Sequence, residues 1–76
     1  MTECVLIFDA DVTQEDVSAI FSEEFPGIAV PIFRNSYQIG SPASFSAVKH
    51  AISTTFSQVP FALAKTKEGK MFFNRP

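Results

Sequence analysis

Two aspartates with one residue between them follow an apolar run near the amino terminus. The run from Cys4 to Phe8 ends at Asp9, and Asp11 and Thr13 come next at alternate positions. Carboxylates at this spacing after a strand can bind a cation together. They also suit the start of a helix, where acids interact favourably with the helix dipole and a threonine hydroxyl caps free N–H groups. The sequence leaves both interpretations open.

An apolar strand followed by Asp-x-Asp-x-Thr resembles the first motif of haloacid-dehalogenase-type phosphatases. The resemblance implies that Asp9 attacks phosphorus, that Asp11 acts as acid and base, and that both hold magnesium. That family completes its metal site with acids from a later strand, yet Glu68 is the only acid after Glu24. Its core also needs a larger parallel sheet than 76 residues supply. We keep a phosphatase-like site as a remote alternative and expect no enzyme, no metal and no cofactor.

A second resemblance lies in the carboxy-terminal third. The segment from Gln58 to Phe61 and the later Lys67 to Lys70 resemble the cis-proline strand and hairpin of thioredoxin- and glutaredoxin-type folds. The resemblance implies a thioredoxin-like arrangement with a cis bond before Pro60. Those folds carry a Cys-x-x-Cys pair at the start of the first helix, but the stretch from Ala10 to Thr13 has no cysteine. Thiol–disulfide chemistry is therefore excluded.

The other reactive side chains stand alone. Cys4 is the only cysteine and His50 the only histidine. A lone thiol inside an apolar run indicates a buried structural residue, and it has no partner for an intrachain disulfide. His50 lies off the apolar stripe of a predicted helix, without a second histidine, so we expect neither a metal site nor a general base there.

Length and composition indicate one small folded domain over residues 1–76. The chain is 46% hydrophobic and contains nine Phe, which is enough for one core. No stretch approaches the ~20 apolar residues of a membrane span. The amino terminus also lacks the pattern of a secretory leader. We therefore expect a cytoplasmic protein.

The charges are segregated along the chain although the net charge is only −2. Seven of the eight acids precede Phe25, and all six basic residues follow it. The acids are Glu3, Asp9, Asp11, Glu15, Asp16, Glu23 and Glu24, and the bases are Arg34, Lys49, Lys65, Lys67, Lys70 and Arg75. This pattern predicts either a dipolar surface or separately solvated faces.

The first half of the chain predicts a strand, a helix and two further strands. The unbroken apolar character of Glu3 to Ala10 predicts a central strand buried on both faces. Thr13 is the expected cap of a helix that runs to Phe25 and stops at Pro26-Gly27. Residues 28–33 predict a strand in which Pro31 marks an edge, a bulge or a strand end. Residues 36–39 predict a short third strand or a loop.

The second half predicts a helix and a hairpin. Ser41 with Pro42, or else Ser44, begins a helix with an apolar face from Phe45 to Phe56. Residues 61–65 and 70–74 predict a hairpin around Glu68-Gly69. The expected fold is a small two-layer α+β or α/β sandwich of order β-α-β-(β)-α-β-β. A ferredoxin-like or thioredoxin-like arrangement would accommodate that order.

Small size favours binding over catalysis, because one core leaves little room for a water-excluding pocket. We predict a non-catalytic interaction module with a protein partner, an inhibitor, adaptor or accessory factor of the kind frequent in phages and mobile elements. Binding of single-stranded nucleic acid by the basic, aromatic carboxy-terminal hairpin is the alternative, and a strand edge offers a route to a homodimer. The candidate partner-binding residues are Arg34, Tyr37, Lys65, Lys67, Lys70 and Phe72.

Overall fold

The computed structural model describes residues 1–76 and contains five strands and two helices. They are β1 (Thr2–Phe8), α1 (Gln14–Ser18), β2 (Ile28–Phe33), β3 (Ser36–Ser41), α2 (Phe45–Thr55), β4 (Phe61–Lys65) and β5 (Met71–Asn74). The predicted element order is confirmed, including the short third strand, which extends to Ser41. No helix is long and apolar enough to cross a membrane.

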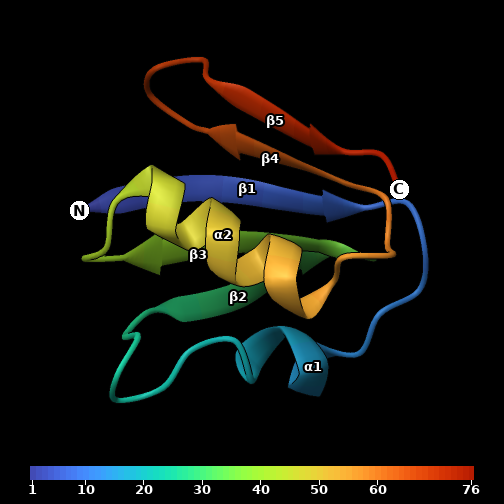
Figure 1. The fold of residues 1–76 in the computed structure, drawn as a ribbon, viewed down its shortest axis with the longest axis horizontal. Helices are drawn as coiled ribbons and strands as arrows, with labels where there is room; N and C mark the ends of the chain where they lie inside the picture. The colour runs from blue at the N-terminus through green and yellow to red at the C-terminus, as the bar shows by residue number, and fades with distance from the viewer.

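The five strands form one sheet in the order β2-β3-β1-β4-β5, and every neighbouring pair is antiparallel. The predicted central position of β1 is confirmed, since it pairs with β3 on one side and β4 on the other. The first two strands are not neighbours, because β3 lies between them. The molecule is therefore a small α+β domain, in which α2 crosses one face of the sheet and α1 lies beside β2 (Figure 1).

The prediction that β1 is buried on both faces is wrong. Cys4, Leu6 and Phe8 are buried, whereas Ile7 between them is 50% exposed. The buried side chains pack with Val17 of α1 and with α2, so the core lies on one face of the sheet. No element covers the opposite face (Figure 1). An apolar run indicated burial, but the chain has only enough helix for one layer.

Helix α1 is shorter than predicted. Thr13 caps it as expected, with the Asp16 N–H donating to Thr13 Oγ1 at 3.1 Å. The helix ends at Ser18 rather than Phe25 because the next residues close a separate turn. In that turn the backbone N–H of Ser22 donates to the Phe25 carbonyl at 3.0 Å, and the Phe25 N–H donates back to Ser22 Oγ at 3.2 Å.

Helix α2 begins at the second of its two predicted caps. Ser44 Oγ accepts a hydrogen bond from the Ala47 N–H at 3.1 Å. Ser41 instead ends β3, where its hydroxyl donates to the Pro26 carbonyl at 2.8 Å. The predicted apolar face is confirmed, since Val48 and Ile52 are fully buried.

The proline and hairpin predictions have mixed outcomes. Pro31 lies in the edge strand β2 beside a register shift, as its missing N–H predicted. The terminal hairpin is confirmed, with Gly69 at φ 68° in its turn. Pro60 follows a trans bond, because the chain contains no cis peptide bond, so the cis-proline feature that the thioredoxin resemblance implies is absent.

Candidate functional site

The aspartates of the phosphatase-like motif lie in the loop after β1. Asn35 Nδ2 donates to Asp11 Oδ1 at 3.1 Å, and Arg34 Nη2 lies 3.3 Å from the same oxygen. The Asn35 hydrogen bond and the Arg34 charge hold the pKa of Asp11 below its ordinary value of 3.8. Asp9 is exposed. No three His, Cys, Asp or Glu side chains come together as a metal-binding group.

The only thiol of the chain is buried and its only imidazole is exposed. Cys4 is fully buried under α2, and burial raises the pKa of its thiol to about 11. The neutral thiol is therefore the stable form, and it is shielded from reagents. His50 is exposed in the middle of α2.

The three lysines that were predicted to bind a partner lie at and beside the turn between β4 and β5. Lys65 Nζ lies 3.0 Å from Glu68 Oε2, and Lys70 Nζ lies 4.0 Å from the same oxygen. The hydrogen bond from Lys65 and its charge lower the pKa of Glu68. Lys67 is exposed. The cluster therefore carries less positive charge than its three lysines suggest.

The other predicted contact residues do not join this cluster. Arg34 lies in the β2–β3 turn, at the opposite end of the sheet and towards its opposite edge. Tyr37 belongs to the core, where it is 5% exposed and meets Phe8 edge-on. Phe72 is half-buried on the helix side, with Lys49 Nζ 5.0 Å from its ring centroid. We therefore remove Tyr37 from the exposed candidates.

The principal surface feature is the uncovered face of the sheet, which we call the open face. The strand register places these side chains on it: Glu3, Val5 and Ile7 of β1, Ile28, Val30 and Phe33 of β2, Ser36, Gln38 and Gly40 of β3, Ala62 and Ala64 of β4, and Met71 and Phe73 of β5. Glu3 is their only charged member. Sequence reasoning missed this face because it assigned the apolar residues of β1 to an internal second layer.

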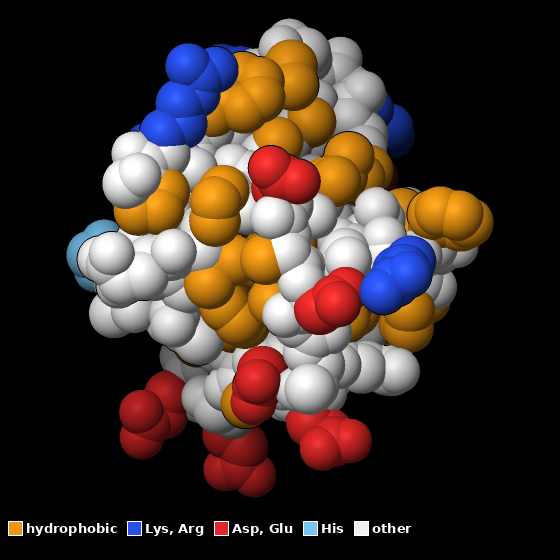
Figure 2. All heavy atoms as spheres, turned by 90° about the vertical axis from the view of Figure 1, so that its right-hand side faces the viewer, with side chains coloured by type: hydrophobic (Ala, Val, Ile, Leu, Met, Phe, Trp, Pro, Cys, Tyr) orange, Lys and Arg blue, Asp and Glu red, His pale blue; other side chains and the backbone are white.

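Exposed apolar residues concentrate on this one side of the molecule. Eight large hydrophobic side chains are exposed. Six of them belong to the open face, and Met1 lines a hollow beside it. The eighth, Ile32, lies in the β2 bulge. Phe33 is the most exposed of the face itself, at 82%. In Figure 2 hydrophobic side chains project on the right, away from α2, and acidic side chains gather at the bottom.

Ridges and grooves run along the open face. Large side chains form ridges on β2, β1 and β5, whereas β4 presents only Ala62 and Ala64 between two ridges. A hollow of about 400 Å³ lies at this groove, between Ile7 and Phe73. A second hollow of about 400 Å³ lies over Gly40 on β3. The open face is therefore apolar and also has raised and hollow regions that a partner could fit.

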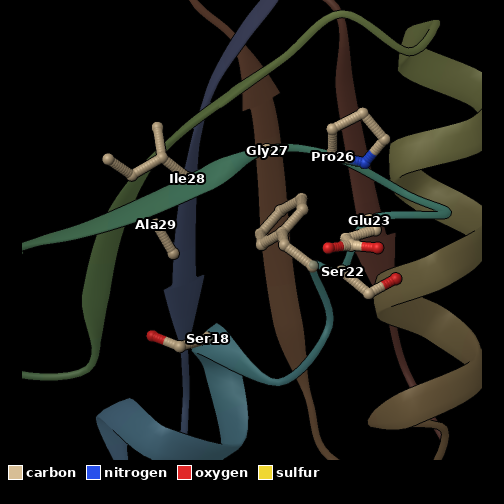
Figure 3. Close-up of a pocket in the computed structure, with 8 residues that line it drawn as sticks. Ser18, Ser22, Glu23, Pro26, Gly27, Ile28 and Ala29 are labelled. Carbon is tan, nitrogen blue, oxygen red and sulfur yellow. The ribbon is translucent and has the colours of Figure 1, made fainter.

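A third hollow, of about 420 Å³, lies between α1 and the start of β2 (Figure 3). Ser18, Ser22 and Glu23 supply its polar groups. The Phe21 ring fills its base so closely that a Cβ on Gly27 would lie 2.5 Å from a ring carbon. No histidine or cation accompanies the serine hydroxyls in this hollow, and the Glu23 carboxylate is its only ionisable group.

Comparison with protein families, with curated proteins and with solved structures found no match to this chain.

Proposed function

We propose that the protein is a non-catalytic interaction module that binds another protein through its open face. The observation that carries this proposal is the gathering of nearly all exposed large apolar side chains on one uncovered side of a five-stranded sheet. Water contact with so many apolar groups is unfavourable, and a partner would relieve it. Small inhibitors, adaptors and accessory factors act in this way.

The size of the face supports a binding role. Five strands spaced about 4.8 Å apart and about 20 Å long give a footprint of roughly 500 Å². The largest apolar patch on a typical monomer covers about 300–600 Å² and is often functional. A face of that size spans this whole sheet, on a chain of only 76 residues.

The chemistry of the face favours protein over nucleic acid. Phosphate binding needs Lys or Arg beside stacking aromatic rings. None of the strand residues on the open face is Lys or Arg, and Arg75 lies just beyond β5 with its guanidinium carbon 5.2 Å from the Phe73 ring centroid. At the hairpin turn Glu68 pairs with Lys65. On β5 the open-face side chain nearest that turn is Met71, which is not aromatic. The nucleic-acid alternative predicts oligonucleotide binding at low salt, which fluorescence anisotropy would detect.

The absence of catalysis is part of the proposal. Support comes from Asp11, whose carboxylate is engaged by Asn35 and Arg34. After Glu24 the chain has no acid except Glu68, which lies in the β4–β5 turn. Magnesium-dependent phosphatase activity that disappears in Asp9→Asn would contradict this part.

For the fold, we infer a ferredoxin-like arrangement extended by one strand. The directions of the paired strands make β1 and β2 run the same way with antiparallel β3 between them, which is the split β-α-β pattern. Strand β4 pairs on the other side of β1, and β5 is the addition. The thioredoxin-like alternative has no support from the antiparallel sheet or the trans bond at Pro60.

Affinity capture with matched surface variants tests the proposed function. The tagged chain is incubated with a lysate of its native host, beside Val30→Lys and Phe73→Lys on the open face and His50→Lys on the helix side. We expect bound protein to fall at least about tenfold with the two face variants, because charge at a buried apolar contact is costly. His50→Lys should capture as the unchanged chain does. Equal capture by all four would overturn the proposal.

A further inference from the structure

We propose that the partner on the open face is a second copy of this chain, packed face to face about a two-fold axis. The inference rests on the proposed function, because it requires the open face to bind protein. The resulting dimer would have four layers, with the two sheets inside and the helices of each copy outside. Such packing keeps the strand directions of two sheets within about 30° of each other.

The side-chain relief of the face is self-complementary. One row across the sheet reads Phe33, Ser36, Ile7, Ala62 and Phe73, from β2 to β5. A two-fold axis along the strands, between β3 and β1, places β2 of one copy over β4 of the other. Each protruding Phe33 then enters the hollow floored by Ala62 and walled by Ile7 and Phe73.

The next row repeats the same relation. It consists of Val30, Gln38, Val5, Ala64 and Met71. The same axis places Val30 over Ala64 of the second copy, between its Val5 and Met71. Two successive rows therefore offer a large side chain on β2 and a matching alanine on β4, which is the relation that close packing of two identical faces requires.

Charge and area also suit a second copy. A face pressed against itself brings like charges together, and the strand residues of this face include only one charge, Glu3 at its end. The hollow that receives Phe33 is also lined by Asp9 and Arg75, whose charges are opposite in sign. The overlap of four strands, about 19 Å by 20 Å, gives roughly 400 Å² of flat footprint per copy before corrugation is counted. Two copies thus approach the ~1,000 Å² at which specific interfaces begin. An interface at this lower limit of size suits a dimer in exchange with its monomer, which a dilution series can resolve.

Pairing through strand edges is the less favourable way to join two copies. Pro31 and the adjacent bulge interrupt the free edge of β2. Strand β5 has a free edge but only four residues, Met71–Asn74. Edge pairing would also leave the apolar face uncovered. Face packing is therefore the assembly that relieves the unfavourable exposure.

Sedimentation velocity from about 1 to 100 µM tests the inference. The untagged chain should pass from monomer to dimer over this range. Phe33→Ser removes the protruding side chain, and Ala62→Leu fills the hollow that receives it. Each variant should raise the dimer dissociation constant at least about tenfold. His50→Ser, on the opposite side, should leave it unchanged.

The Ala62→Leu variant distinguishes specific docking from general stickiness. It adds apolar surface, so unspecific association would strengthen, whereas docking of Phe33 would weaken. Circular dichroism should show native folding of every variant, since Phe33 is 82% exposed and Ala62 lies on the open face. A tighter dimer in Ala62→Leu, or an unchanged dimer in Phe33→Ser, would overturn the inference.

A chain that stays monomeric at 100 µM would also overturn it. The proposed function has its own readout in that case. If the capture experiment then recovers a different protein that the face variants lose, the docking surface stands and only its occupant changes. If neither a dimer nor such a protein is found, both proposals fail.

Discussion

Asn35 holds the β2–β3 turn against the segment that follows β1. Its carbonyl accepts from the Phe8 N–H at 2.8 Å, and its side chain donates to Asp11 at 3.1 Å and accepts from the Val12 N–H at 3.4 Å. Its φ of 60° lies in the left-handed region, which asparagine tolerates better than most residues. The Asp-x-Asp motif thus has a structural partner that its own spacing does not indicate.

We expect Asn35→Ala to lower the free energy of unfolding by about 1–3 kcal/mol, measured by urea denaturation. Two effects contribute, the lost side-chain hydrogen bonds and the strain of alanine at positive φ. Asn35→Gly is the matched control, because glycine accepts this φ and loses only the hydrogen bonds. A variant with alanine as stable as the original chain would mean that these contacts add nothing.

The buried thiol of Cys4 should make the folded chain less stable in alkaline solution. Burial raises the pKa of its thiol from 9.0 to about 11 in the folded chain. The contribution of the neutral thiol is fully present below pH 9 and is lost as the pH rises through about 11. Cys4→Ala should therefore lose less stability than the original chain between pH 9 and 11, as followed by urea midpoints. Equal alkaline losses would contradict the assignment.

At the scale of elements, the sequence predicted most strands correctly and one helix poorly. Alternation in Met71 to Asn74 and the turn at Gly69 determine the hairpin locally. The length of α1 depends instead on the turn between Ser22 and Phe25, which competes with helical hydrogen bonds. The apolar residues after α1 continue at helical spacing although the backbone does not. Periodicity alone could not reveal that competition.

The choice between Ser41 and Ser44 as the cap of α2 gives an element-scale prediction. Ser44→Ala should cost about 1 kcal/mol, because the Ala47 N–H loses its acceptor. Ser46→Ala is the matched control, an exposed position inside the same helix that caps nothing. It should leave stability unchanged or slightly higher, since alanine favours helix. Thermal unfolding of both variants checks the difference, and equal losses would refute the cap.

At the scale of the whole molecule, the open face could not be predicted from the apolar runs. Val5 and Ile7 give β1 the composition of a strand buried on both faces. Apolar residues indicate that a strand is covered, but they do not indicate whether the covering layer comes from the same chain. Under the proposed function the covering layer belongs to another chain. The predicted contact residues missed the face because they were chosen for charge and aromaticity at turns.

Glu3 provides a prediction about the assembled molecule. In the proposed dimer the two Glu3 carboxylates lie near each other at the same end of β1, so Glu3→Gln should tighten association by removing their repulsion. Added salt should have the same effect on the original chain by screening it, and should have little effect on Glu3→Gln. Sedimentation at low and high salt measures both. Weaker association in Glu3→Gln would place the axis elsewhere.

The interrupted edge of β2 limits what concentrated protein can become. Fibril growth by strand addition requires each new molecule to accept a strand at one edge and offer another. Pro31 removes an N–H from one of the two edges of this sheet, and the bulge beside it twists the ladder out of register. Joining at β5 then ends after a single addition. A chain with an apolar face can thus form a pair while lacking the second uninterrupted edge that fibril growth by strand addition needs.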